Sequence, residues 1–570
     1  MILSSLVKRY EDRSEVPLGW EKRSASYAIV LDESGRLISI DSQEYVSEKT
    51  KKMIKPTLIL PTVGKGRSGK NAYETAFFLC DNADYMLGLD PRKFESSKKL
   101  HLSLLDNVDT PQSCALKAYF ENGIPTVPEE YQENVDTAAN YIFSVNNKVK
   151  GRVDYNDCDA EIREAWNITQ VNEGGDTICL VTGKQDAIIK LHSKVSLPGL
   201  TMGGQPLIAM NDQTSFRSYG ARTDAPPAFI GQYASTAYTS ALNDLLKSDD
   251  NSVKIGNDRA VFWADSGGDA AEEVVACLFE AKISDEAGEG DLTEVMQRIS
   301  RGDIASDINL PFYLLCLSPN AARISVRFFH VSTFGEIIGN IREHYERLVV
   351  VSDGRTKFEF MPIWLLLSET TIKKSASDAH PLLGGQLLRA VITNSRYPQT
   401  LYNSIIGRVR AGEEINRVKA AIIKAVLIKN YSESEVTTMA LNEQTMDRAY
   451  VLGRLFSVLE QLQGRANGTA TIRQRYFSSA SANPKLTFPV LLNLSMHHAA
   501  KLDNATYFEK QKGELLEKLD VENTPFPAIL SLEEQGKFIL GYYHQTQAHF
   551  AGKNAKNQTN QEDEENLTDA

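Results

Sequence analysis

The chain has 570 residues and a formal net charge of −12 at pH 7, and its balance of hydrophobic (42%) and charged (24%) residues is typical of a folded globular protein and not of a disordered one. Its six cysteines are scattered without any CxxC spacing, which argues against a structural zinc site and a disulfide framework and favours a cytoplasmic protein. The sequence has no signal-peptide pattern and no apolar run long enough to span a bilayer, so we expect no membrane partner.

The first elements predicted along the chain are strands. Residues 26–41, SYAIVLDESGRLISID, predict a β-hairpin, because two β-rich runs flank a polar turn in which Gly35 can take a positive φ. Residues 55–61 predict a short strand that ends at Pro61, since proline has no N–H to donate to a ladder. This strand leads directly into a glycine-rich loop.

The glycine-rich loop at 64–71 resembles a Walker A motif that lacks one of its residues. Gly64, Gly69 and Lys70 have the required spacing, but Asn71 stands where a Ser or Thr hydroxyl binds Mg²⁺. The strands expected later in the chain end without the acidic residue that an NTPase needs. The loop can still hold phosphates if the segment after it begins a helix, because backbone N–H groups at a helix start bind anions.

Two further strands are expected at 176–183 and 322–330. In 322–330, ARISVRFFH, polar and apolar residues alternate, so the apolar side chains should lie on one face. We expect the opposite face, with Arg323 and Arg327, to meet phosphate or a partner subunit.

A helical pattern follows after about residue 330. Residues 413–428 predict an amphipathic helix whose apolar stripe excludes its lysines. A polar break at 429–445 resembles a linker, and the apolar stripes beyond it predict a small helical bundle. Ser531 and Glu534 have the spacing of a capping box at the start of its last helix.

Basic residues cluster in three acid-poor stretches although the chain as a whole is acidic. Residues 49–70 include seven basic residues and no acid, 389–429 include eight against Glu413 and Glu414, and 461–502 include no acid. Segregated basic surfaces let an acidic protein bind a polyanion locally. The alternative, which the sequence leaves open, is that these stretches are solvated helix faces.

Three of these features carry side chains suited to nucleic-acid contacts. On the 64–71 loop, the candidates for phosphate and base contacts are Lys65, Arg67, Lys70 and Asn71. A second glycine-rich segment, 197–220, adds amide and arginine side chains, namely Gln205, Asn211, Gln213 and Arg217. The acid-free stretch of the bundle adds basic residues suited to lining a strand, namely Arg465, Arg473, Arg475, Lys485 and Lys501.

Patterns of catalysis and metal binding are not found in the sequence. His497 and His498 are adjacent, so on a helix their side chains point about 100° apart, and no GxSxG, HxxE or HExxH occurs. We therefore expect binding chemistry, with no cofactor, no metal and no catalytic residue. The enzyme alternative is an ATP-dependent nucleic-acid remodeller that uses the degenerate loop at 64–71.

Several short motifs occur in a fixed order along the chain. They are MILSSLVKRYED at the start, SYAIVLDESGRLI, DNADYMLGLD (81–90), SFRSYG (215–220), VFWA (261–264), ARISVRFF (322–329), AYVLGRLFSVLEQLQ (449–463) and FILGYYHQTQ (538–547). In this order they resemble the large subunit of the type I-C CRISPR Cascade complex over residues 1 to about 550, and the last two motifs are the most specific. The chain departs from the family pattern at Gln205, where a small residue is expected.

The resemblance implies a non-enzymatic subunit of a crRNA-guided complex. In such a complex base pairing reads most of the target sequence, while a protein subunit reads the short PAM on double-stranded DNA. The implied partners are the crRNA, the target DNA, the backbone and crRNA 5′-end subunits, the small subunit, and the helicase–nuclease that is recruited after the R-loop forms. It also implies that the C-terminal bundle resembles the small subunit and is made separately from an internal translation start, for which Met439 and Met446 are candidates.

Together these elements predict an α+β N-terminal and central region followed by an all-α C-terminal helical bundle. We expect an α+β domain with the PAM- and DNA-contacting loops at 1–285, a mixed, mostly helical region at 286–435, the bundle at 436–550, and a disordered acidic tail at 551–570.

Overall fold

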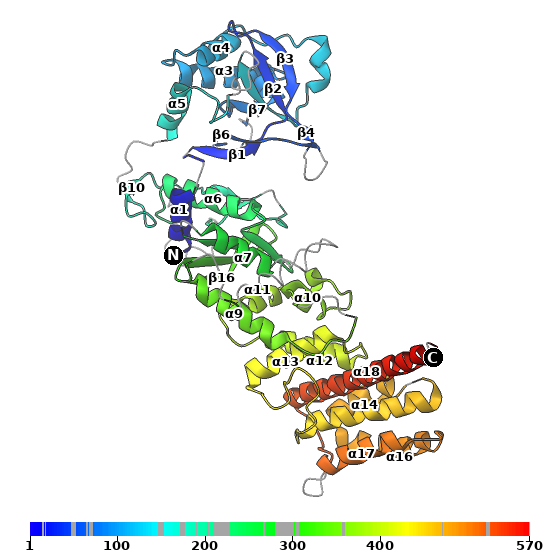
Figure 1. Cartoon of the computed structure of the whole chain (residues 1–570). Helices are drawn as coiled ribbons and strands as arrows, with labels where there is room; N and C mark the ends of the chain where they lie inside the picture. Colours follow the sequence, from blue (N-terminus) through cyan, green and yellow to red (C-terminus); the bar gives the residue numbers. More distant parts are fainter. Residues whose placement is uncertain are drawn as a thin grey trace. The chain divides into compact units, whose positions relative to one another are not determined.

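The described residues form two compact units (Figure 1). The first unit comprises Met1–Val195 with Pro206–Asp244, and the second comprises Ser196–Gln205 with Leu245–Ala570. The computed structural model describes the whole chain except residues 14–15, 18, 47–52, 64–66, 68–71, 146–152, 171–176, 190, 202–203, 210–227, 266–267, 280–300, 302–306, 356–359, 470, 520–524 and 569–570.

The first unit is built on a four-stranded mixed sheet in the order β3-β2-β8-β7. Its strands are β2 (Tyr27–Leu31), β3 (Leu37–Ser42), β7 (Cys80–Asn82) and β8 (Asn140–Val145). β2 pairs antiparallel with β3 and parallel with β8, and β7 pairs antiparallel with β8. The β2–β3 pair confirms the hairpin predicted from the sequence. Gly35 at its turn has a φ of +72°, and a β-carbon there would overlap the backbone of α4 (Pro111–Glu121).

Two layers cover the faces of this sheet. On one face α3 (Pro91–Leu105) and α4 pack their aromatic residues against β8, with the rings of Tyr119 and Phe143 5.3 Å apart. On the other face β6 (Thr57–Pro61), paired antiparallel with β1 (Trp20–Ser24), packs Leu58 and Leu60 against the sheet. The strand predicted to end at Pro61 is therefore confirmed.

The other elements of the first unit are short. They are α1 (Ile2–Arg13), β4 (Tyr45–Val46), β5 (Met53–Ile54), η1 (Ala72–Glu74), α2 (Ala83–Met86), η2 (Glu129–Asn134), α5 (Ala160–Gln170), β9 (Thr177–Ile178), β10 (Gln185–Asp186), β11 (Lys194–Val195), β12 (Gln205–Pro206) and α6 (Gln232–Lys247), the last two reaching into the second unit. The longer strand predicted at 176–183 is wrong. The chain turns back after β9, and the N–H of Gly183 donates to the carbonyl of Cys179.

The second unit begins with a four-stranded antiparallel meander. Its strands, in spatial and sequence order, are β13 (Ser252–Ile255), β14 (Asp258–Ala264), β15 (Pro311–Asn320) and β16 (Arg323–Thr333). β16 confirms the strand predicted at 322–330, but the regular alternation is wrong. The pairing register shifts next to Arg327, so Phe328 is buried whereas Val326 is 44% exposed.

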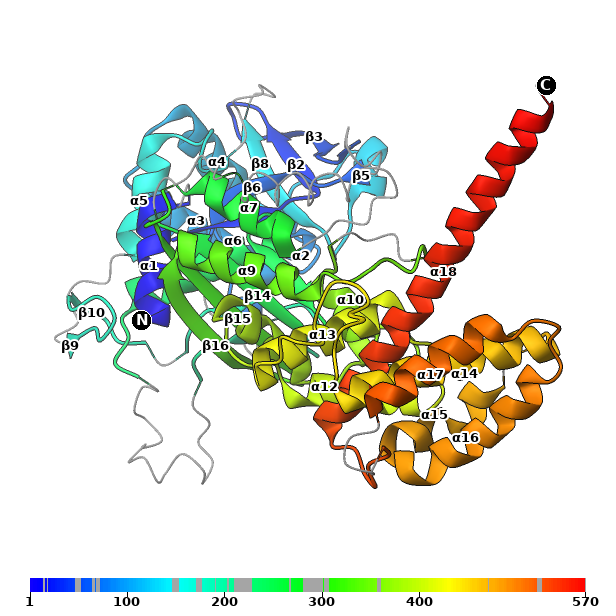
Figure 2. The same ribbon diagram turned by 60° about the horizontal axis from the view of Figure 1, so that its bottom comes forward.

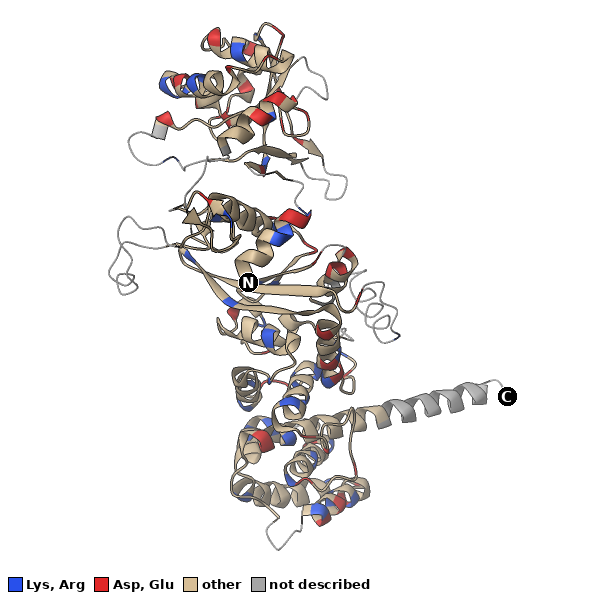
Figure 3. Cartoon of the chain, turned by 90° about the vertical axis from the view of Figure 1, so that its left-hand side faces the viewer, with Lys and Arg blue, Asp and Glu red and all other residues tan. Residues whose placement is uncertain are grey.

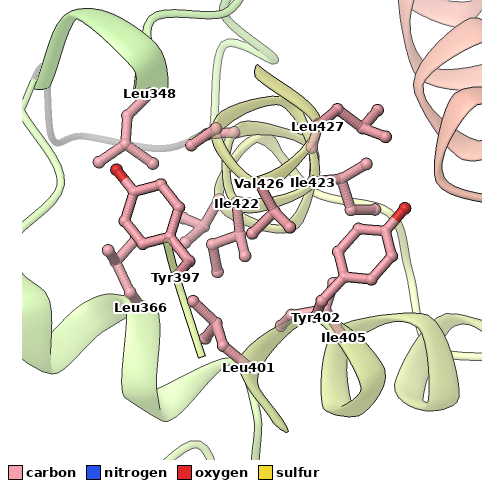
Figure 4. Packing of buried hydrophobic residues seen from close by; sticks show 14 of the residues in the cluster. Leu348, Leu366, Tyr397, Leu401, Tyr402, Ile405, Ile422, Ile423, Val426 and Leu427 are labelled. Carbon is pink, nitrogen blue, oxygen red and sulfur yellow. The ribbon is translucent and has the colours of Figure 1, made fainter. Parts of the chain in front are cut away.

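Helices continue the core of the second unit beyond the sheet. They are α7 (Asp269–Phe279), α9 (Phe334–Leu348), α10 (Ile363–Ser368), η4 (Ala376–Asp378), α11 (Leu383–Ile392), α12 (Gln399–Arg410) and α13 (Arg417–Tyr431). Figure 4 shows Ile422 and Val426 of α13 beside Leu401 and Tyr397, with Ile423 on the side of Tyr402. α13 confirms the predicted helix, but the one-sided stripe is wrong. Its lysines are buried too, because neighbouring helices surround it.

The C-terminal part is all-α, as predicted. It consists of α14 (Arg448–Asn467), α15 (Ile472–Ala482), α16 (Pro484–Ala499), α17 (Thr506–Leu519) and α18 (Leu532–Thr568), which pack side by side (Figure 2). The capping box is confirmed: the N–H of Glu534 donates to Ser531 Oγ at 3.3 Å, and the N–H of Ser531 donates to Glu534 Oε2 at 2.7 Å. Within the described part of the chain, no helix is both long and apolar enough to cross a membrane.

The predicted segment boundaries stay predictions. The polar break does not separate two cores, because one apolar cluster runs from Val253 to Tyr543 and includes Val436 within the break. α18 runs to Thr568, into the segment for which we predict a disordered tail, but the side chains after Ala551 lie outside the described residues.

The two most specific sequence motifs lie on α14 and α18 and contact each other. Tyr450 and His544 share a hydrogen bond of 2.8 Å between the phenol oxygen and Nδ1. One and two turns further along, Arg454 Nε donates to Gln545 Oε1 at 2.9 Å, and the hydroxyls of Ser457 and Thr546 lie 2.8 Å apart. These residues therefore form a buried polar seam between the two helices.

Candidate nucleic-acid interface

The 64–71 loop follows β6, and Arg67 is its one described residue. Lys65, Lys70 and Asn71 lie outside the described residues, so the nucleic-acid contacts expected of them stay predictions. Arg67 itself shows how the loop is fixed to the first unit.

Arg67 is held by two aromatic rings and a carboxylate. Its guanidinium carbon lies 3.9 Å from the ring centre of Phe77 and 3.7 Å from that of Tyr85. Its Nε donates to the carbonyl of Thr75 at 2.7 Å, and an Nη forms an ion pair with Asp81. Each cation–π contact contributes about 0.5–2 kcal/mol, depending on how dry the site is. We name these four side chains, Arg67, Phe77, Asp81 and Tyr85, the Arg67 anchor.

Asp81 links the Arg67 anchor to the sheet. It belongs to β7 and is 1% exposed. Besides Arg67, it accepts the N–H of Phe77 at 2.9 Å and that of Asn82 at 2.8 Å. Burial raises the pKa of the Asp81 carboxyl, and the ion pair with Arg67 and the two N–H groups oppose that shift. Tyr85, four residues later on α2, completes the aromatic pair.

The carboxylates near Asp81 have partners of their own. Asp84 forms an ion pair with Lys93 at 2.6 Å. Asp90 is the N-cap of α3 and accepts the N–H of Arg92 at 3.0 Å. The motif DNADYMLGLD therefore supplies an anchor, an ion pair and a helix cap, and its acids do not converge on one point.

A strained residue precedes Asp81 in the chain. Leu79 has a φ of +57°, which is unusual for a residue with a β-carbon. Its N–H donates to Nε2 of the buried His101 at 3.0 Å, while Nδ1 of His101 lies 2.8 Å from the carbonyl of Ser97. This arrangement requires a neutral imidazole with its proton on Nδ1. Burial lowers the pKa of His101 to about 4, which keeps it neutral at pH 7.

The expected helix after the 64–71 loop is wrong. Residues 72–74 form only the 3₁₀ turn η1, and the next helix, α2, begins at Ala83. A P-loop needs a helix that starts within the loop, so that its N–H groups and dipole face the phosphates. In addition, β6 pairs antiparallel in a two-stranded sheet and not within a parallel one. The described geometry therefore differs from that of a P-loop NTPase.

The second glycine-rich segment is described only in part. Gln205 is half-buried at the start of β12, directly after Gly204, whose φ is +132°. Asn211, Gln213 and Arg217 lie outside the described residues. Their predicted roles stay predictions.

The basic residues of the bundle separate into three groups. Arg465 lies exposed in the last turn of α14, and Lys501 donates to Asn467 at the end of the same helix at 2.9 Å. Arg475 lies exposed near the start of α15, which follows α14 directly. Lys485 lies at the start of α16, whereas Lys501 follows its end, about 24 Å away for a helix of this length.

Arg473 points into the bundle. One of its Nη atoms donates to the carbonyl of Glu413 at 2.8 Å, and its guanidinium lies 5.7 Å from the ring centre of Tyr542. It is therefore held by protein contacts, and contact with a strand stays a prediction.

The second acid-poor stretch, 389–429, forms no acid-free surface. Lys419 is 2% exposed and forms ion pairs with Glu369 at 2.6 Å and Glu413 at 3.4 Å. Glu413 also pairs with Lys374 and Arg408, at 3.1 and 2.7 Å. The acids come from segments distant in sequence, and Figure 3 shows acidic and basic residues interspersed over the helices of the second unit.

Arg327 also has an internal partner. Its Nε lies 3.3 Å from Asp258, which is 1% exposed, and an Nη donates to Ser318 Oγ at 2.8 Å. The expectation that Arg323 and Arg327 act together toward phosphate is therefore wrong for Arg327. Only Arg323 is exposed.

The comparison with known families decides the identity of the chain. The family model described as CRISPR-associated protein (Cas_Csd1) matches residues 3–550. The chain belongs to the Cas_Csd1 family. No curated protein matches it. The family is one of Cascade structural subunits, so this Cas_Csd1 chain is a CRISPR-associated Cascade component.

Sequence reasoning missed three side chains of this Cas_Csd1 site. Phe77 and Tyr85 were not expected to hold Arg67, and Asp81 was interpreted as part of an acidic loop. The spacing of Asp81 and Tyr85 by four residues in an aromatic-rich segment was the only available signal. Among the described residues, no group of three His, Cys, Asp or Glu side chains is arranged to hold a metal ion.

Proposed function

We propose that this Cas_Csd1 chain is the non-enzymatic large subunit of a type I-C Cascade complex. In this role it recognises the PAM on double-stranded DNA, stabilises the R-loop and helps to recruit the helicase–nuclease. Its partners are the crRNA, the target DNA, the backbone and crRNA 5′-end subunits, and the small subunit. The family membership supports the coarser part of this proposal.

The observation that carries PAM recognition is the Arg67 anchor. A loop that reads DNA must hold its donors in fixed positions, because ordering a free loop during binding lowers affinity. The anchor fixes the middle of the loop to β7 and α2, while Lys65, Lys70 and Asn71 lie two, three and four residues from Arg67 in the sequence. Lysine side chains suit phosphate contacts, and the amide of Asn71 can read a base edge.

The ATP-dependent alternative has less support. Asn71 removes the hydroxyl that binds Mg²⁺, and η1 stands where a P-loop has its helix. We therefore propose that the 64–71 loop binds DNA phosphates and not a nucleotide.

The strand-lining role proposed for the bundle rests on fewer residues than the sequence suggests. Arg465, Arg475 and Lys501 lie near one end of α14. Together they suit contact with the backbone of a displaced or paired strand. Lys485 would contact a strand only if that strand also reaches the far end of α16.

The test is target binding by the assembled complex with its crRNA. Lys70→Ala should weaken binding to every target sequence and lower the slope of log affinity against log salt by about one contact. Lys99→Ala, an exposed lysine on α3 outside the loop, is the matched control and should leave the slope unchanged. Equal salt slopes for Lys70→Ala and the wild type would contradict the proposal.

A further inference from the structure

Four large apolar side chains stand exposed on one two-stranded ribbon of the first unit. β4 and β5 pair antiparallel, and all four of their residues face solvent. The exposed fractions are 52% for Tyr45, 56% for Val46, 59% for Met53 and 36% for Ile54. We name this pair the β4–β5 ribbon.

The apolar side chains lie on both faces of the ribbon. Residues directly opposite each other in an antiparallel pair point to the same face, and neighbours along a strand point to opposite faces. Tyr45 is opposite Ile54, and Val46 is opposite Met53. One face therefore carries Tyr45 with Ile54 and the other carries Val46 with Met53. A ribbon that lies flat on its own protein would have one apolar and one polar face.

Such a ribbon gains little stability by itself. Two short strands without a covering layer are marginal in water, and exposed apolar strands tend to associate. An apolar surface that persists in this form usually marks an interaction site. The two-faced arrangement fits a partner that encloses the ribbon.

We infer that the β4–β5 ribbon inserts into an apolar slot of another protein subunit, with carboxylates at the rim of that slot. Contacts with nucleic acid are made mainly by charged and amide groups, whereas the four ribbon residues are apolar or aromatic. Lys55, beside the ribbon, is already paired with Glu44 at 3.8 Å. The sequence that joins the two strands, SEKTKK, has three lysines and one glutamate, which accounts for an acidic rim.

The position of the ribbon leaves the DNA-reading loop free. β5 lies before β6 in the chain and the 64–71 loop follows β6, so the five-residue strand separates them by about 17 Å. A partner protein can therefore hold the ribbon while the loop contacts DNA.

Hydrogen exchange of the full chain tests the occupant. The chain would be compared free, assembled with crRNA and the other subunits encoded beside its gene, and assembled with target duplex added. We expect peptides that contain β4 and β5 to exchange at least about tenfold more slowly after assembly without DNA. Unchanged exchange on assembly would overturn the inference. Slowing that appears only with the duplex would overturn it as well, because the occupant would then be nucleic acid.

Paired substitutions test the two-faced geometry. Tyr45→Ser with Ile54→Ser changes one face, and Val46→Ser with Met53→Ser changes the other. Each pair should weaken assembly by about tenfold or more without changing the melting temperature of the free chain. Leu180→Ser with Leu191→Ser is the control, since these apolar residues of the same unit are 74% and 87% exposed. Loss of assembly with only one ribbon pair, or an equal loss with the control, would overturn the slot.

Discussion

Gly453 of α14 lies directly against the backbone carbonyl of Phe538 in α18, so closely that a β-carbon at position 453 would overlap the carbonyl oxygen. Gly541 of α18 has the same relationship to the carbonyl of Tyr450 in α14. The two glycines let the helix backbones approach, and the polar seam of Tyr450 and His544 lies beside them. The two most specific motifs of the sequence therefore record one helix–helix contact.

Gly453→Ala should destabilise the second unit. The added methyl group has no space, and overpacking of this kind costs about 1–3 kcal/mol. The expected result is a lower melting temperature of the full chain in calorimetry. Gly513→Ala on α17 is the control, because nothing lies within 4 Å of a β-carbon there and alanine favours a helix by about 0.5–1 kcal/mol. A Gly453→Ala variant as stable as Gly513→Ala would contradict the close contact.

Three buried histidines should make the protein sensitive to mild acid. Burial lowers the pKa of His344 and His544 to about 3 and that of His101 to about 4. Below about pH 6.5 the unfolded chain binds protons at these residues that the folded chain does not. Stability is therefore lost as the pH falls from about 6.5 toward 4, by up to about 1.4 kcal/mol per pH unit for each histidine. Melting temperatures between pH 7 and 5 measure this loss.

His544→Asn isolates one of these histidines. An asparagine can still accept the hydroxyl of Tyr450, but it does not titrate. The pH dependence of the melting temperature should therefore become shallower by the contribution of one proton. His497→Asn on the exposed side of α16 is the control and should leave the dependence unchanged. An unchanged dependence in His544→Asn would show that His544 is protonated in the folded state.

The local elements of this fold could largely be predicted from the sequence. The hairpin at 26–41, the strand that ends at Pro61 and the capping box of Ser531 and Glu534 each depend on neighbours within a few residues. Such local signals are visible in one sequence.

What could not be predicted depends on distant partners. The burial of Lys419 follows from Glu369, fifty residues earlier, and the exposure of Val326 follows from a register shift against β15. Arg67 has the composition of a DNA contact, but Phe77, Asp81 and Tyr85 fold back onto it. A basic residue in an acid-poor stretch therefore carried no information about its ion-pair partner.

Arg67→Ala should weaken target binding without changing its salt dependence. As an anchor, Arg67 orders the loop and releases no DNA counterions, whereas a phosphate contact would lower the salt slope by about one. The variant should also destabilise the first unit, because the buried Asp81 loses its charged partner. Binding isotherms of the assembled complex at several salt concentrations separate the two roles. A slope lowered as in Lys70→Ala would make Arg67 a direct phosphate contact.

The independent folding of residues 436–550 is open to a direct test. α18 contacts α12 through the hydroxyl of Tyr402, which donates to the carbonyl of Leu532 at 3.0 Å, and Lys537 pairs with Glu433. A fragment that starts at Met439 lacks both partners, so we expect it to form the bundle with lower stability than a fragment that starts at residue 395. Circular dichroism of the two fragments during thermal unfolding measures the difference. Equal melting temperatures would show that α12 and α13 do not support the bundle.

An internal translation start at Met439 or Met446 would produce such a fragment in cells. Both side chains are exposed, so Leu at both positions should not disturb the fold. The double variant should abolish a short C-terminal product on an immunoblot. A short product at full level in the double variant would place the start elsewhere.

The central claim is that this Cas_Csd1 chain reads the PAM through the anchored 64–71 loop. The most direct measurement is the PAM preference of the assembled complex, determined for the wild type and Asn71→Ala with a library of duplexes randomised at the PAM. If Asn71 reads a base, the variant should lose on the order of 1–3 kcal/mol of discrimination at one PAM position and keep its preference at the others. A PAM preference identical to that of the wild type, at every position, would contradict this account of the loop.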